Sequence, residues 1–144
     1  MILISHRGNT EGPSTLENDP TYVVNTLKKY NTEIDVWYTE DGFYLGHDTP
    51  TYAVPVSFLK KKGLWCHAKN LEALIELNKN QIEHFFWHDT DDRVLTSSGY
   101  FWTYPGKQLC QNSIAVMPEI GMGINNVQSN IYGVCSDLVG AMYD

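Results

Sequence analysis

Two carboxylates stand two residues apart inside an apolar segment of the chain. Glu33 and Asp35 alternate there with Ile34, Val36 and Trp37. Residues i and i+2 of an extended strand project from the same face, so both carboxylates are expected on one face. Because like charges repel, the pair implies a cation between the carboxylates, a proton on one of them, or exposure to water. A divalent cation is therefore one of three interpretations.

The same spacing recurs in the segment LWCHAK, where it places an imidazole beside an ammonium group, His67 and Lys69. Two further pairs follow short apolar segments: His6 with Arg7, and His47 with Asp48. The carboxyl ends of parallel strands form one crevice, so these side chains are expected to meet there. Carboxylates and cations can hold a phosphate ester against a metal ion, while histidines move protons near neutral pH.

The segments that must position these residues alternate between strand and helix in the first half of the chain. Apolar, β-branched and aromatic residues predict three strands, and an Asp-Gly turn adds a hairpin arm. These are residues 2–5, 33–39 and 64–69, with the arm at 43–47.

Cap residues predict where the helices begin. Asp19 precedes a proline and is expected to cap one helix, and Asn70 is expected to cap another. In the second helix, Leu71, Leu74 and Ile75 have the spacing of an apolar stripe, which predicts that this face packs on the sheet.

After residue 80, strand-like segments follow one another with little room for helices. They are residues 84–88, 93–97, 100–104, 113–119 and 131–137. With the three earlier strands they make eight, which predicts one α/β domain over 1–144, a compact (β/α) TIM-type barrel. A usual barrel needs about 250 residues, so several helices of the second half are expected to be shortened or missing. A homo-oligomer is one way to cover the strand faces left open.

The overall charge limits the classes of partner. A formal charge of -7 and a pI of about 5.1 argue against a general nucleic-acid or anionic-membrane binder, because such partners favour clustered Lys and Arg. The basic run Lys60, Lys61 and Lys62 is interpreted as a solvated helix end.

The number of cysteines and the hydropathy of the chain indicate in which cellular compartment the protein is expected. The three cysteines are an odd number without CxxC spacing, which predicts neither a disulfide framework nor a thiolate zinc site. We find no signal peptide and no apolar run of the roughly 20 residues that span a bilayer. A cytoplasmic protein without stable membrane insertion is expected.

The order of these motifs resembles the amino-terminal half of the glycerophosphodiester phosphodiesterase family, which is related to phosphatidylinositol-specific phospholipase C. The motifs are HRGN, EN, EID, DGFYLGHD and HAKN. The resemblance covers residues 5–48 and 64–70. The later segments FWTYPG and YGVCSD are similar to late strands of that family, at a shorter spacing. The chain looks like a short, truncated member, which implies a barrel and a phosphodiesterase activity.

The resemblance also implies roles for single residues. It implies an acid/base pair, two phosphate-binding cations and two metal ligands: His6 and His47, Arg7 and Lys69, Glu33 and Asp35. The third metal ligand of the family is an acidic residue two positions before the lysine, and here that position is His67. Mg²⁺ or Ca²⁺ is the expected cofactor, and the imidazole leaves other divalent ions open. Phosphate contact is the alternative role of His67.

Four more residues are candidates for the site: Glu17, His88, Trp102 and Glu119. Glu17 matches the Glu-Asn motif of the family. His88 either reaches the crevice, or it has no role in the site and belongs to a turn that Asp89 caps. Trp102 either lines the pocket or fills the barrel, and Glu119 either joins the site or pairs with one of its cations. Asp137 is expected to form a charge pair at the end of the last strand, and His84 is expected to face water.

The sequence therefore predicts metal-dependent hydrolysis of a small phosphodiester substrate. The favoured reaction converts a glycerophosphodiester to glycerol 3-phosphate and an alcohol by histidine acid/base catalysis. Two alternatives use the same residues: a transferase of the sphingomyelinase D or phospholipase D type, and a pseudoenzyme that binds a phosphate ligand without turnover. No nucleic-acid partner is expected.

Overall fold

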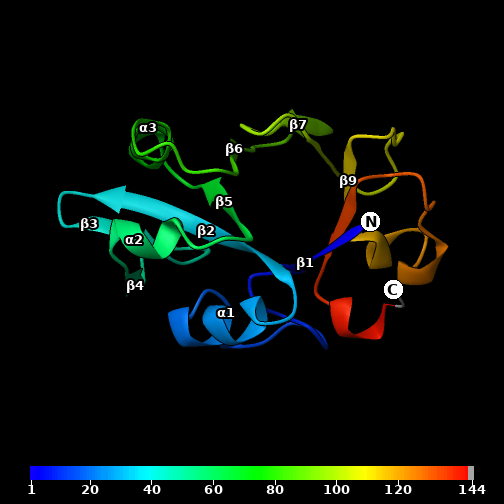
Figure 1. Cartoon of the computed structure of the whole chain (residues 1–144), viewed down its shortest axis with the longest axis horizontal. Helices are drawn as coiled ribbons and strands as arrows, with labels where there is room; N and C mark the ends of the chain where they lie inside the picture. The colour runs from blue at the N-terminus through cyan, green and yellow to red at the C-terminus, as the bar shows by residue number, and fades with distance from the viewer. Residues whose placement is uncertain (143–144) are drawn as a thin grey trace.

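The chain folds around a curled, mixed β-sheet whose central strands are parallel (Figure 1). The computed structural model describes residues 1–142. The parallel strands lie in the order β6, β5, β2, β1, β10, β9, β8. Their bounds are β1 Ile2–His6, β2 Asn31–Thr39, β5 Leu64–Ala68, β6 Phe85–Trp87, β8 Phe101–Thr103, β9 Ser113–Val116 and β10 Gly133–Ser136. The antiparallel strands are β3 (Gly42–Leu45) on β2, β4 (Tyr52–Ala53) on β3, and β7 (Arg93–Leu95) on β8.

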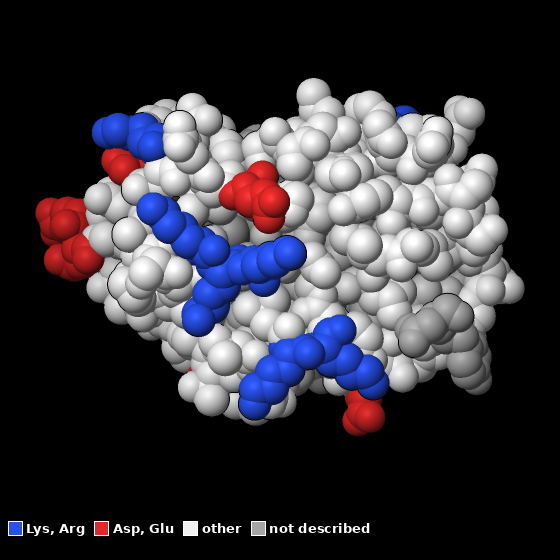
Figure 2. Space-filling view, in the orientation of Figure 1, with Lys and Arg blue, Asp and Glu red and all other residues white. Residues whose placement is uncertain are grey.

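The helices cover only part of this sheet. Within residues 1–142 they are α1 (Pro20–Leu27), α2 (Val56–Leu59) and α3 (Leu71–Lys79), with 3₁₀ turns at Pro118–Ile120, Ile124–Asn126 and Val139–Ala141. All three α-helices lie around the half of the molecule that contains β2 and β5, and coil and turns flank β9 (Figure 1). Blue Lys and Arg side chains gather on the same half (Figure 2). None of the helices in the described chain is long and apolar enough to cross a membrane.

The predicted (β/α) TIM-type barrel is wrong. The strands of the second half form, but β7 pairs antiparallel with β8, and in residues 80–142 only 3₁₀ turns provide helical structure. Residues 88–92 join β6 to β7, and residues 96–100 join β7 to β8. These links are too short for a crossover helix, because a parallel crossover needs about a dozen residues. The result is a curled half-barrel with helices on one part, not a ring of alternating strands and helices.

Alternation along β2 separates the core from the candidate site. Ile34 and Val36 are fully buried and pack in one apolar cluster with Val23 of α1. Glu33 and Asp35 alternate with them in the sequence and therefore project from the opposite, concave face of the curled sheet. The predicted sharing of one face by the two carboxylates is confirmed.

Aromatic side chains fill much of the concave face. Trp65, Phe86 and Trp102 belong to one buried cluster, in which the rings of Phe86 and Trp102 lie 4.5 Å apart. His84 joins them by stacking on Trp65 at 3.8 Å, with its Nδ1 2.6 Å from Oγ of Ser98. The expectation that His84 faces water is wrong, because it shares the inward face of its segment with Phe86.

Both predicted helix caps are confirmed. The Asp19 side chain accepts hydrogen bonds from the backbone N–H groups of Thr21 and Tyr22 at the start of α1. Asn70 Oδ1 accepts from the N–H of Ala73, and the Asn70 amide also donates to the carbonyl of Tyr38. The second bond fixes the start of α3 against the end of β2.

The apolar stripe predicted for α3 is wrong in two of its three residues. Ala73 and Leu77 are fully buried, whereas Leu71 and Ile75 are 60% and 47% exposed. Leu74 packs against the core while partly exposed. The buried face is therefore rotated toward the small side chain of Ala73, which allows close approach of the helix to the sheet.

Candidate active site

A cavity of about 370 Å³ opens toward the carboxyl ends of the parallel strands. Nine of the predicted site residues line it: His6, Arg7, Glu33, Asp35, His47, His67, Lys69, His88 and Trp102. Asp89, Tyr104, Val116 and Met117 complete the lining. The other two predicted residues lie behind these, Glu17 bonded to Arg7 and Glu119 bonded to Asp137.

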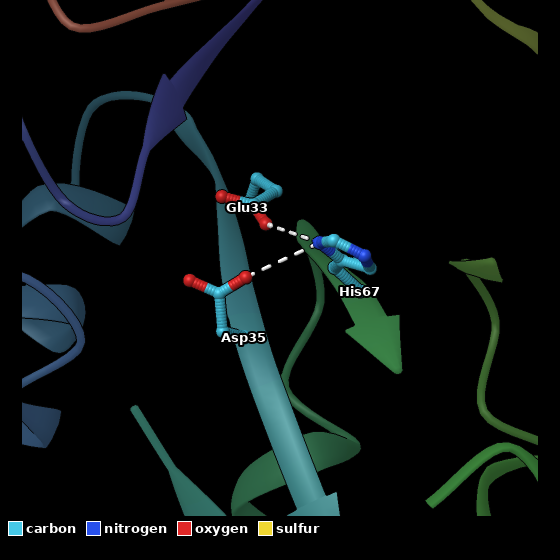
Figure 3. Close-up of side chains that lie close together, drawn as sticks. All are labelled: Glu33, Asp35 and His67. Carbon is cyan, nitrogen blue, oxygen red and sulfur yellow. Dashed lines mark ion pairs between the residues drawn. The ribbon is translucent and has the colours of Figure 1, made fainter. Parts of the chain in front are cut away.

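Glu33, Asp35 and His67 converge at the centre of the cavity. The two carboxylates project from β2 toward His67 on the neighbouring strand β5 (Figure 3). Nδ1 of His67 lies 3.2 Å from Oδ1 of Asp35 and 4.0 Å from Oε2 of Glu33. One ligand atom of each residue lies within 4.8 Å of the other two. Asp35 and His67 are direct register partners, which explains why two separate i, i+2 spacings meet.

The unsatisfied oxygens of the carboxylates favour a cation. Glu33 and Asp35 are 2% and 1% exposed, and Oε1 of Glu33 and Oδ1 of Asp35 are buried without a hydrogen-bond partner. Buried carboxylate oxygens without donors are costly, and divalent cations take such oxygens as ligands. The imidazole of His67 adds a nitrogen ligand that Mn²⁺, Fe²⁺ and Zn²⁺ accept. These three residues therefore fit a divalent cation.

The two carboxyl groups differ in their affinity for protons. Burial and the adjacent charge of Asp35 raise the pKa of Glu33. Burial also acts to raise the pKa of Asp35, but contacts with His47 and His67 and the charge of Arg7 outweigh it and hold that pKa well below its usual range. Asp35 is therefore the constant anion of the pair.

Asn18 holds Asp35 in place from behind. Its amide nitrogen donates to Oδ2 of Asp35 at 3.0 Å, and its amide oxygen accepts from the backbone N–H of Asp35 at 2.9 Å. Asn18 is 1% exposed and has a φ of 65°, in the left-handed region that asparagine tolerates better than most residues. Asn18 is not among the residues predicted for the site, although it stands in the Glu-Asn motif.

Arg7 connects three groups of the site. Its Nη2 donates to Nδ1 of His47 at 2.7 Å, its Nη1 donates to Oε1 of Glu17 at 3.1 Å, and its Nε lies 3.1 Å from Oδ2 of Asp35. The φ of Arg7 is 60°, a conformation that is strained for a residue with a side chain. This turn directs the guanidinium back over β2, where it faces the cavity that Lys69 also lines.

His6 is oriented by a carboxylate at the end of β10. Nδ1 of His6 lies 2.8 Å from Oδ1 of Asp137, and Nε2 lies 3.8 Å from Oε1 of Glu33. Burial lowers the pKa of His6, but the hydrogen bond with Asp137 and the charge of Glu33 outweigh it, so the net pKa is raised. Glu119 supports this arrangement by accepting from the backbone N–H of Asp137 at 3.1 Å. The charge pair predicted for Asp137 takes the form of this contact with His6, which is an ion pair only when the imidazole is protonated.

Asn9 donates hydrogen bonds to both carboxylates that orient the site, Glu17 beside Arg7 and Asp137 beside His6. Its amide nitrogen donates to Asp137 and to Glu17, both at 2.8 Å, and its amide oxygen accepts from the hydroxyl of Tyr22 at 3.1 Å. Asn9 is fully buried. The sequence gives no signal for Asn9, because Glu17 lies in an irregular loop and Asp137 lies 128 residues away, so no local spacing indicates these contacts.

Aromatic rings form the far wall of the cavity. His88 stacks on Tyr104 with ring centroids 3.8 Å apart, and His67 stacks on Phe86 at 5.1 Å. His88 thus reaches the cavity, while its Nε2 lies 3.0 Å from the carbonyl of Asp91. Trp102 lines the cavity and is 2% exposed, so it serves both as wall and as core.

Comparisons with protein-family models, with curated proteins and with solved structures find no match to this chain.

Proposed function

We propose that this protein is a divalent-metal-dependent phosphodiesterase. The observation that carries the proposal is the set of buried, unsatisfied carboxylate oxygens of Glu33 and Asp35 beside His67. Histidines and cations surround this set in one cavity of about 370 Å³. A site of this size takes a small polar substrate, and the combination matches the charges of a phosphodiester and the proton transfers of its cleavage.

The metal-ligand candidates and the two cationic side chains act on different oxygens of the phosphate. Glu33, Asp35 and His67 would hold the divalent cation, which supplies positive charge to a non-bridging phosphate oxygen when bound. Arg7 and Lys69 stabilise the charge that develops on the other phosphate oxygens. The bond of Arg7 to Glu17 keeps the guanidinium in place before substrate arrives.

The hydrogen bonds of the two histidines support a different role for each. His6 donates from Nδ1 to Asp137, so its Nε2 carries the lone pair and accepts a proton from the attacking hydroxyl. His47 accepts at Nδ1 from Arg7, so its Nε2 carries the proton that goes to the leaving alcohol. The side chain of His47 is 44% exposed, which supports departure of the alcohol at the mouth of the cavity. The attacking hydroxyl belongs to water or to the substrate itself.

The proposed substrate is a glycerophosphodiester, on the resemblance of the HRGN, EID and GHD motifs. The test measures release of glycerol 3-phosphate from a panel of glycerophosphodiesters by the purified protein, with Mg²⁺, Ca²⁺, Mn²⁺ or Zn²⁺ and with chelator. The variants His6→Ala and His47→Ala are expected to lose at least about 100-fold in kcat, because each removes one proton transfer. His84→Gln, which changes a histidine outside the cavity, is the control.

Metal-dependent release that both alanine variants lose supports the proposal and names the ion. Near-normal rates in both variants would contradict the assignment of the histidines. A folded protein that binds inorganic phosphate but cleaves no diester would favour a binding protein instead.

A further inference from the structure

Half of the basic residues of this acidic chain belong to two loops. Lys28 and Lys29 precede β2, and Lys60, Lys61 and Lys62 precede β5. Neither residues 20–32 nor residues 49–71 contain an Asp or Glu. Outside these two ranges the chain carries all 17 acidic residues and four basic ones, so charge is strongly segregated.

The two loops lie side by side in the structure. β2 and β5 are adjacent parallel strands, and the N–H of Thr32 donates to the carbonyl of Gly63 at 2.9 Å. All five lysines are exposed. The lysine ion pairs in residues 1–142 are formed instead by Lys79 and Lys107. In Figure 2 the blue side chains gather over the region of α1 and α2, and red acidic groups lie at the borders of this patch.

We propose that this lysine face, made of Lys28, Lys29, Lys60, Lys61 and Lys62, docks the protein on an anionic lipid surface. Clusters of four to eight basic residues bind the negative surface of membranes rich in phosphatidylserine or phosphoinositides, through long-range attraction without insertion. Exposed lysines suit this role, since their ammonium groups remain hydrated on flexible stems. The docking needs no membrane-spanning helix, and it revises the expectation, drawn from the net charge alone, that the chain does not bind anionic membranes.

The distribution of charge favours a lipid surface over a nucleic acid. A planar surface meets one face of the protein only, and charges that lie farther from it than the Debye length of about 8–10 Å are largely screened. A long flexible polyanion extends past the five lysines and meets the acidic surface. Single-stranded nucleic acids also use exposed aromatic side chains for stacking. The aromatic residues nearest the lysines, Tyr30 and Phe58, are instead partly or fully buried.

The position of the lysine face determines how the cavity is presented. The lysines stand at the amino ends of β2 and β5, and the cavity lies toward the carboxyl ends of the same parallel strands. A docked molecule therefore directs its cavity away from the lipid and toward solution. The inference does not depend on the proposed phosphodiesterase activity.

The test is sedimentation of the full chain with vesicles of phosphatidylcholine alone and of phosphatidylcholine with about 30 mol% phosphatidylserine, at about 0.1 M and about 0.5 M salt. We expect binding to the anionic vesicles only, and its loss at high salt. The triple variant Lys60→Gln, Lys61→Gln, Lys62→Gln is expected to bind at least about ten-fold more weakly. The triple variant Lys79→Gln, Arg93→Gln, Lys107→Gln loses the same charge elsewhere and is expected to bind like the unmodified protein.

Three results would overturn the proposal. The first is no binding of the unmodified protein to anionic vesicles, and the second is an equal loss of binding in the two triple variants. The third is binding to single-stranded polyuridylate that depends on Lys60, Lys61 and Lys62 while vesicle binding is absent, which would assign the face to nucleic acid. Hydrolysis of a soluble diester in the vesicle-free assay is expected to be unchanged in the lysine variant, so failure here leaves the proposed activity to be judged separately.

Discussion

Replacing Glu33 by glutamine is expected to stabilise the protein when metal is absent. The Glu33 carboxyl is 2% exposed, has an unsatisfied Oε1 and shares its face with Asp35. Glutamine keeps the shape and removes a buried charge next to a like charge. Removing such an uncompensated charge is worth about 1–2 kcal/mol, which corresponds to a rise in Tm of roughly 3–6 °C for a domain of this size.

The same substitution is expected to remove the stabilisation by metal. A ligand present at 100 times its Kd stabilises the folded state by about 2.7 kcal/mol. The unmodified protein should therefore melt higher in Mn²⁺ than in chelator, and Glu33→Gln should respond much less. The order of stability of the two proteins thus reverses between chelator and metal.

Thermal melts in both conditions provide the assay, with Glu83→Gln as a matched control. Glu83 has a side chain that is 69% exposed and lies outside the cavity lining, so its replacement should leave both melts unchanged. The reasoning is refuted if Glu33→Gln lowers Tm in chelator and the unmodified protein shows no shift with any divalent ion. Glu33 would then be a structural carboxylate.

Three further predictions concern the residues that support the site and the core. Asn18→Ala loses two hydrogen bonds to Asp35 and places alanine at a positive φ, so urea denaturation should show a loss of about 2–4 kcal/mol, with Asn18→Gly about 1 kcal/mol less affected. Asp137→Asn should lower kcat on the order of 100-fold at nearly unchanged Tm, because an amide no longer fixes the proton of His6 on Nδ1. Burial lowers the pKa of His84, so the unfolded chain binds its proton more tightly than the fold does. The free energy of unfolding should therefore fall between about pH 7 and pH 5, and fall less in His84→Gln; equal slopes would contradict this.

Local signals in the sequence predicted the elements and the centre of the site. Alternation along β2 and β5 located Glu33, Asp35 and His67 on one face, since the side-chain period of a strand is fixed by geometry. Asp19 and Asn70 indicated the helix starts because capping depends on neighbours in the sequence. These features need no knowledge of distant contacts.

The remaining features depend on contacts that no short segment reveals. The direction of β7 follows from its short links, and counting strands without their pairing gave a barrel. The small side chain of Ala73 lets α3 approach the sheet closely. The buried face of the helix is therefore the one that contains Ala73, and the larger Leu71 is exposed. The bond of Asn9 to Asp137 joins the two ends of the chain, so it appears only once β1 and β10 are neighbours.

The most direct test of the central claim is anomalous diffraction from crystals of the protein soaked with Mn²⁺. The account predicts one strong peak at bonding distance, about 2.0–2.3 Å, from carboxylate oxygens of Glu33 and Asp35 and from a nitrogen of His67. A cavity without such a peak at saturating Mn²⁺, or a peak held by other residues, would contradict the metal site on which the proposed function depends.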